Sequence, residues 1–167
     1  EWRRKYPDVR FIPIEKNKGF APTVNIGFRI STGKWLGTIN DDVTLTKDWL
    51  KNLLICAGKS IGSINPIVKK VDGSIESQGI KVLPKGKAKP IIELVPKVCH
   101  EVDATNAAAV IYSKEALNKV GLFDEKFGSY LEDIDLSLRL KRAGYKNIVS
   151  AKSEIIHMGQ LTSKKLG

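Results

Sequence analysis

The sequence has no long hydrophobic run: no stretch approaches the roughly 18 apolar residues that a membrane-spanning helix needs. The first residues are charged and amphipathic, so the sequence predicts no signal peptide. The chain has only two cysteines, and Cys56 and Cys99 lack the close spacing of metal ligands. Cys56 lies in an apolar helical pattern, which predicts a buried free thiol and fits a reducing cytoplasm.

The sequence also lacks internal repeats and low-complexity tracts, which excludes a repeat array. Its 167 residues, 42% hydrophobic and 28% charged, are ordinary for a soluble globular protein with a substantial core. The sequence therefore predicts one domain over residues 1–167.

Negative charge is scarce relative to positive charge: 28 Lys and Arg against 18 Asp and Glu give a net charge of +10. Such an excess indicates either a polyanionic partner or a lysine-rich solvated surface. The densest patch contains Lys81, Lys85, Lys87 and Lys89, and no aromatic residue that could stack on bases lies between them. We therefore favour the solvated surface and expect no nucleic-acid partner, with loose steering of an anionic substrate as a by-product.

An acidic turn directly follows a short apolar segment. Residues 35–39 predict a buried strand, and Asn40-Asp41-Asp42 follow it. In open α/β sheets, ligands bind outside the carboxyl ends of the strands. Two adjacent carboxylates there suit a hard cation such as Mg2+ or Mn2+. The alternative is that these residues only form a turn, which Asn and Asp favour.

The order of predicted elements begins as β-α-β-α-β, which indicates parallel strands covered by helices. Its members are a strand over 9–15, a helix over 21–32, a strand over 35–39, a helix from Thr46, its cap, to about Gly58, and a strand over 61–68. Further elements are a weak strand over 75–83, a basic loop over 84–90, a strand over 102–112, a helix from its Ser113 cap to 120, a helix from 130 to Gly144, and short strands over 148–149 and 155–157.

A second acidic cluster, Glu132-Asp133, opens the last helix, where the helix dipole favours negative charge. This alone could explain Glu132, and Asp135 can pair with Arg139 four residues on. Asp133 points about 100° away from Glu132. In a cleft beside other acids and a phosphate its pKa would rise, which is how an aspartate becomes a general base.

His157 follows an apolar pair near the end of the chain. It is either a hydrogen-bonded structural residue or a further metal ligand that the end of the chain brings back to Asp42.

Several of these segments, in this order and spacing, resemble the inverting family 2 glycosyltransferases of the GT-A fold, especially rhamnosyltransferase-like and cell-wall-biosynthesis members. They are Asn17-Lys18-Gly19-Phe20-Ala21 with Asn25 and Gly27, Asn40-Asp41-Asp42, Gly121-Leu122-Phe123-Asp124-Glu125, and Glu132-Asp133-Ile134-Asp135-Leu136 with Arg139 and Ala143-Gly144-Tyr145. The resemblance covers residues 9 to 160.

The resemblance implies an α/β fold of GT-A type: a Rossmann-like mixed sheet flanked by helices, N-terminally truncated. Residues 1–70 would face the nucleotide sugar and residues 71–167 the acceptor. Family members normally begin with a strand, a helix and a second strand that carry an acidic residue for uracil, and we expect this half-site to be absent. The Gln-x-x-Arg-Trp motif of processive members is also absent, which predicts transfer of a single sugar.

The resemblance also implies roles for the residues. Asp42, with His157, would hold Mg2+ or Mn2+ at the donor diphosphate, and Asp41 would hold the ribose or the sugar. Asp133, with Glu132 beside it, would be the catalytic base. The other donor-binding residues would be Asn17, Asn25, Asn40 and Asn106.

The implied partners are a nucleoside-diphosphate sugar and a glycan or lipid-linked acceptor. The resemblance implies work in cell-surface glycan synthesis, in the cytoplasm and at the membrane periphery.

Three alternatives remain open. The chain could be a glycosyltransferase-like module that binds an acceptor or a partner without chemistry. It could be a nucleotidyltransferase, although that class wants a Gly-rich phosphate loop near a lysine, and the sequence has none. It could bind nucleic acid, which only the net charge supports.

Overall fold

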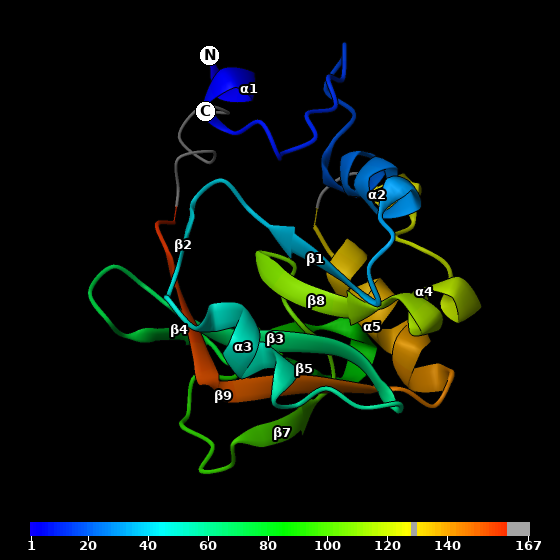
Figure 1. The fold of residues 1–167 in the computed structure, drawn as a ribbon. Coiled ribbons are helices and arrows are strands. Elements are labelled where there is room, and N and C mark those ends of the chain that lie inside the picture. The colour runs from blue at the N-terminus through cyan, green and yellow to red at the C-terminus, as the bar shows by residue number, and fades with distance from the viewer. Residues whose placement is uncertain (128–129, 160–167) are drawn as a thin grey trace, which may run out of the picture.

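In the computed structural model, which describes residues 1–127 and 130–159, a mixed β-sheet is covered by helices on both faces (Figure 1). The order of neighbouring strands in the sheet is β1 (Trp35–Ile39), β8 (Ala109–Ser113), β3 (Ile61–Lys69), β9 (Lys146–His157) and β2 (Val43–Leu45). Two further strands join this sheet: β4 (Ile75–Ser77) pairs with β3, and β7 (Cys99–Val102) pairs with β9. Strands β5 (Ile80–Val82) and β6 (Ala88–Pro90) form a separate hairpin. The α-helices are α1 (Trp2–Lys5), α2 (Phe20–Ile30), α3 (Trp49–Leu54), α4 (Lys114–Val120) and α5 (Glu132–Arg142), and 3-10 turns cover Pro84–Gly86 and Glu125–Phe127.

The sheet confirms the predicted mixed α/β class, but its strand order differs from a simple parallel arrangement. Strand β8 lies between β1 and β3 and is antiparallel to both, so β1 and β3 run in the same direction without touching. Only β3 and β9 pair in parallel among the described strands. The order of helices and strands along the chain does not reveal such an insertion, because β8 comes from far downstream.

The predicted strand over residues 9–15 is wrong. These residues belong to no helix or strand, and the apolar side chains of Val9, Phe11 and Ile12 are exposed. A strand satisfies its backbone groups through a neighbour, and none of the described strands lies beside this segment. In Figure 1 it extends away from the sheet, next to α2.

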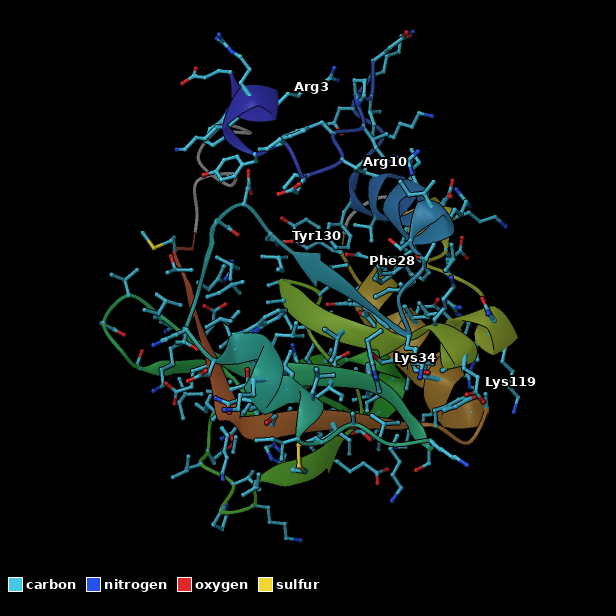
Figure 2. All side chains as sticks on the ribbon, in the orientation of Figure 1. Arg3, Arg10, Phe28, Lys34, Lys119 and Tyr130 are labelled. Carbon is cyan, nitrogen blue, oxygen red and sulfur yellow. A yellow bond between two sulfur atoms is a disulfide. The ribbon has the colours of Figure 1, made fainter. Side chains whose placement is uncertain are left out.

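Alternation along the strands builds a core on each face of the sheet. On β8, Val110 and Tyr112 face α2, α4 and α5, whereas Ala109 and Ile111 face α3. Phe28 points from α2 toward the sheet (Figure 2). Its ring packs edge-on against the ring of Tyr112, with 6.0 Å between the two ring centroids. The one strand thus joins both cores, and all five of its residues are at least partly buried.

Local signals place the helices well, with one exception. Ser113 Oγ accepts a hydrogen bond from Ala116 N at 3.3 Å and caps α4, as predicted. Helix α5 buries Leu136 and Leu140 and ends before Gly144, also as predicted. Thr46 does not cap α3: its hydroxyl donates to the carbonyl of Glu154, and the helix begins later, at Trp49.

Three predicted strands have different extents. The short strands over 148–149 and 155–157 are parts of the single twelve-residue strand β9. The strand predicted over 102–112 is interrupted, because residues 103–108 leave the ladder between β7 and β8. We call residues 103–108 the crossing segment.

Buried polar side chains hold the crossing segment in place. Asn65 on β3 donates to the carbonyls of Asn106 and Ala109 at 3.1 and 2.9 Å and accepts from Asn106 N at 2.9 Å. Asn147 on β9 donates to the carbonyl of Asp103 at 2.9 Å. Ser137 Oγ on α5 accepts from Thr105 N at 3.1 Å. The segment is therefore fixed by three separate elements of the fold.

Cys56 and Cys99 form a disulfide, visible as the yellow bond near α3 in Figure 2. The prediction of a free thiol at Cys56 is therefore wrong. The sequence could not show the pairing because the two residues are 43 positions apart and meet only when β7 joins the edge of β9. The prediction of a reducing compartment therefore loses the support that it drew from a free thiol at Cys56.

In the part of the chain that the structure describes, none of the helices has the length and apolar character that a membrane span requires.

Removing the disulfide should destabilise the fold markedly. Closing a 43-residue loop restricts the unfolded chain by about 4 kcal/mol in the chain-entropy estimate. We expect Cys56→Ser/Cys99→Ser to lower the free energy of unfolding in urea by about 2–4 kcal/mol. Chemical reduction of the wild type should have the same effect, and an unchanged urea midpoint in both cases would contradict the cross-link.

Asn65→Ala should loosen the crossing segment. The substitution removes three hydrogen bonds and leaves buried main-chain groups without partners, which costs about 1–3 kcal/mol for each such group. We expect a loss of about 2–4 kcal/mol in urea unfolding, with faster amide exchange at Asn106. Asn118→Ala, on the exposed side of α4, is the matched control. Unchanged exchange at Asn106 would show that the segment is held by other bonds.

Candidate active site

The crossing segment joins the carboxyl end of β1 to the start of α5. The hydroxyl of Thr38 donates to the carbonyl of Ala107, and Asn40 N donates to the carbonyl of Ala108, both at 2.8 Å. Ala107 N in turn donates to Asp133 Oδ2 at 3.2 Å. The turn after β1 and the first turn of α5 are therefore both hydrogen-bonded to the crossing segment.

Asp133 has the environment of a general base. Burial raises the pKa of its carboxyl, although hydrogen bonds from Ala107 N and Ile134 N act in the opposite direction. The Ile134 bond, 2.8 Å long, fixes Oδ1. A raised pKa makes the carboxylate a better proton acceptor than an exposed aspartate.

Glu132 and Tyr112 are buried near this carboxylate. Burial raises the pKa of Glu132, and its Oε2 atom has no partner within the described protein. Tyr112 OH is likewise buried without a partner, and burial together with the charge of Asp133 raises its pKa far above the usual value. Tyr112 is therefore a neutral hydroxyl near two acids. No sequence motif singles out Tyr112, which is one of several hydrophobic residues in a predicted strand.

The chain enters α5 through two consecutive left-handed residues. Tyr130 and Leu131 have φ values of +75° and +69°, and both side chains are exposed. For residues with a Cβ, this backbone conformation is strained, and such strain gathers at functional sites. Tyr130, labelled in Figure 2, stands just ahead of Glu132 and Asp133 in the chain.

The other half of the site forms where β2 pairs with the end of β9. Val43 lies opposite His157 in this antiparallel pair, and Met158 N donates to the carbonyl of Asp42 at 2.8 Å. Asp42 Oδ2 lies 3.3 Å from His157 Nε2. The structure thus brings together the two residues predicted to hold a metal ion.

These two side chains fit a divalent cation. Asp42 Oδ1 is buried and has no partner within the described protein. The 3.3 Å between Asp42 Oδ2 and His157 Nε2 is close to the about 3 Å that separates neighbouring ligands of an octahedral ion with bonds of about 2.1 Å. No group of three or more His, Cys, Asp or Glu side chains gathers around one point in residues 1–127 and 130–159. A pair of protein ligands completed by phosphate and water is the arrangement Mg2+ often has.

The comparisons with known proteins agree with this geometry. The sequence profile of the family described as Glycosyl transferase family 2 matches residues 1–61, which include the acidic turn after β1. Over these residues the chain is similar to glycosyl transferase family 2. The match ends before Asp133 and His157, so it does not assign roles to them.

In sequence, a named glycosyltransferase is similar to nearly all of the chain. An N-acetylglucosaminyl-diphospho-decaprenol L-rhamnosyltransferase of Mycobacterium tuberculosis is 23% identical over 92% of the chain. The chain spans 60% of that relative's length.

Solved glycosyltransferase structures show the same fold. GalNAc-T7 with UDP, GalNAc and Mn2+ superposes with a TM-score of 0.76 at 16% identity, over 97% of this chain and 35% of that one. A mannosyltransferase of Pyrobaculum calidifontis in complex with GDP-Man and Mn2+ gives 0.69 at 15% identity, over 96% of this chain and 43% of that one. These similarities confirm the predicted GT-A fold.

The five residues predicted to bind the donor occupy different environments in this glycosyltransferase fold. Asp41 is exposed at the acidic turn. Asn40 lies beside it and helps line a groove between α2 and β1, together with Phe28, Gly37 and Ile39. Asn17 is exposed before α2, where its Oδ1 accepts from Gly19 N at 2.9 Å.

Asn25 and Asn106 have structural partners. The amide of buried Asn25 donates to the carbonyl of Phe123 and to Glu125 and accepts from Phe123 N, which docks the loop after α4 onto α2. Asn106 Oδ1 accepts from Ala108 N at 2.7 Å within the crossing segment. Their donor contacts, like those of Asn17, Asn40 and Asp41, stay predictions.

Asp133→Asn should stabilise the glycosyltransferase fold above the raised pKa of Asp133. Burial raises the native pKa above the unfolded value of about 3.8, so the native state binds this proton more tightly than the unfolded chain. The free energy of unfolding therefore falls as pH rises through the native pKa. The neutral amide avoids this loss. The free energy of unfolding in urea should therefore be higher for the variant than for the wild type at pH 8, and this difference should shrink toward pH 4.

Asp8→Asn, at an exposed position, is the control and should show no such pH-dependent gain. Equal stabilities of wild type and Asp133→Asn at pH 8 would contradict a buried, energetically penalised carboxylate.

Proposed function

We propose that this chain contributes the metal and acceptor sides of an inverting glycosyltransferase that moves a sugar from a nucleoside-diphosphate donor to an acceptor hydroxyl. The observation that carries the proposal is the crossing segment, which bonds both the end of β1 and Asp133. This arrangement sets a base near the acids that follow β1, with Asp42 paired to His157. A base and a diphosphate site close together are what a single displacement at a sugar carbon requires.

In the proposed reaction, Asp133 accepts the proton of the acceptor hydroxyl. The acceptor oxygen then forms a bond to C1 of the donor sugar while the bond from C1 to the phosphate oxygen breaks, so the configuration at C1 inverts. The nucleoside diphosphate leaves with the electron pair of the broken bond. A divalent ion held by Asp42 and His157 would neutralise charge on this leaving group.

The surroundings of Asp133 support its role. Ala107 N and Ile134 N fix the orientation of its two oxygens, and burial raises its pKa. Glu132 and Tyr112 are buried near Asp133. We infer that Glu132 positions the base rather than accepting the proton itself, since its buried Oε2 points into the protein.

The relatives suggest the substrates. The mycobacterial relative is named for an acceptor linked through diphosphate to decaprenol, and the two solved glycosyltransferases hold UDP or GDP-Man with Mn2+. We infer a nucleoside-diphosphate sugar and a lipid-linked or glycan acceptor in cell-surface glycan synthesis. Residues 1–70 would face the donor, and the later part of the chain would face the acceptor. A membrane-bound acceptor would require working at the membrane periphery.

Titration of the chain with UDP and dTDP, each with and without Mn2+, tests the donor side. We expect binding that depends on Mn2+ and that Asp42→Ala abolishes, because the ion loses one of its two protein ligands. Asp48→Ala, an exposed acid before α3 that caps nothing with its side chain, is the charge-matched control. Mn2+-dependent binding that survives in Asp42→Ala would contradict the proposed metal site.

Transfer from donor to acceptor tests the base. Asp133→Asn should retain Mn2+-dependent nucleotide binding but lose about 10²–10⁴-fold in transfer rate, the usual contribution of a general base. The assay needs a nucleoside-diphosphate sugar and an acceptor that carries a free hydroxyl. Normal turnover by the variant would exclude Asp133 as the base. Binding without transfer in the wild type would favour a binding module.

A further inference from the structure

A second acidic residue reaches the Asp42–His157 pair. Glu76, on β4, places its two carboxylate oxygens 3.0 and 3.2 Å from His157 Nδ1. On the opposite edge of the same ring, Nε2 lies 3.3 Å from Asp42 Oδ2. All three side chains are mostly buried, with 16 to 32% of their surface exposed. His157 is therefore held between two carboxylates.

The position of Glu76 is set by the sheet. Strand β4 pairs with β3 through Ser77 and Val68, and β3 pairs with β9 through Lys69 and Ile156. Glu76 is thus delivered beside His157 by two successive strand pairings. The same side chain lines a pocket with His157, Met158 and the hairpin residues Lys70 and Asp72.

Glu76 is unsuited to bind the same ion as Asp42. The two ring nitrogens of a histidine point in different directions, so the carboxylates that they contact lie on different sides of the ring. Consistent with this, no three such side chains surround one point in the described part of the chain. Any effect of Glu76 on an ion beside Asp42 must therefore pass through His157.

We propose that Glu76 is a positioning residue for the metal site: it accepts the Nδ1–H of His157, so that Nε2 presents its lone pair on the Asp42 side. A carboxylate on the far nitrogen fixes the tautomer and ring orientation of a metal-binding histidine and makes it a stronger ligand. This inference rests on the proposed function, because it requires an ion at Asp42 and His157. The inference adds Glu76, on β4, to the proposed metal site, although Glu76 belongs to neither of the two acidic motifs.

Mn2+ binding to the full chain, followed by electron paramagnetic resonance of the free ion, tests the inference without a turnover assay. Glu76→Ala should weaken Mn2+ binding 10–100-fold, the usual effect of losing such a partner. Glu76→Gln keeps an oxygen that can accept from Nδ1, so it should weaken binding much less. Glu101 is an exposed glutamate on β7 that pairs with Lys146 at the opposite end of β9 from His157. Glu101→Ala removes the same charge as Glu76→Ala, and this control variant should bind Mn2+ like the wild type.

Pulsed electron paramagnetic resonance adds a readout that a merely structural ion pair would not move. Bound Mn2+ in the wild type should show coupling to a histidine nitrogen, which His157→Ala abolishes. Glu76→Ala should reduce or lose this coupling at saturating Mn2+, and Glu76→Gln should retain it.

The outcomes separate the two proposals. Wild-type Mn2+ affinity and nitrogen coupling in Glu76→Ala, with binding still lost in Asp42→Ala, would overturn the role of Glu76 and leave the proposed function standing. The role of Glu76 would also be overturned if Glu76→Ala lowered only the thermal stability. It would likewise be overturned if Glu76→Gln bound Mn2+ as weakly as Glu76→Ala, because this would indicate an effect of charge alone. Absence of Mn2+ binding by the wild type would overturn both.

Discussion

The geometry of the site depends on the buried hydrogen bonds that hold the crossing segment. Residues 103–108 belong to no helix or strand, yet most of them are buried, where main-chain groups without partners are costly. Asn65, Ser137 and Asn147 supply those partners from β3, α5 and β9. The segment is therefore tied to three elements of the fold, and it is hydrogen-bonded in turn to Asp133 and to the end of β1. Support of this kind keeps a catalytic group in a productive orientation.

The second constraint is the pairing of β2 with β9. Strand β2 has only three residues, but its antiparallel register sets Val43 against His157 and thereby brings Asp42 to the histidine. The twelve-residue strand β9 spans the sheet and is also the centre of the pairings with β3 and β7. Strand β9 thus both joins β2, β3 and β7 into the sheet and places His157. A change that disturbs the pairing of β9 would therefore also move His157.

The sequence predicts what local chemistry decides and misses what distant pairings decide. The Ser113 cap, the helix stop before Gly144 and the α5 stripe depend on neighbours within a few residues, and all are present. The insertion of β8 between β1 and β3, and the cross-link of Cys56 to Cys99, depend on strands brought together over tens of residues. Glu76 belongs to this second class, because a lone glutamate in a weak strand has no local signal of its contact with a histidine 81 positions away. The acidic motifs were visible because the chemistry and the helix dipole both act locally.

Energetic cost also gathers where the proposed chemistry lies. Six buried side-chain atoms lack a partner in the described protein, and three of them, on Asp42, Tyr112 and Glu132, lie at the site. The two left-handed residues before α5 add backbone strain at the same place. Most folds satisfy nearly all buried polar groups, so their departures mark function. Under the proposed function, the stability lost at these atoms would be the consequence of keeping Asp133 basic and the acidic pocket ready for a polar substrate. The two cores on either face of the sheet offset this loss.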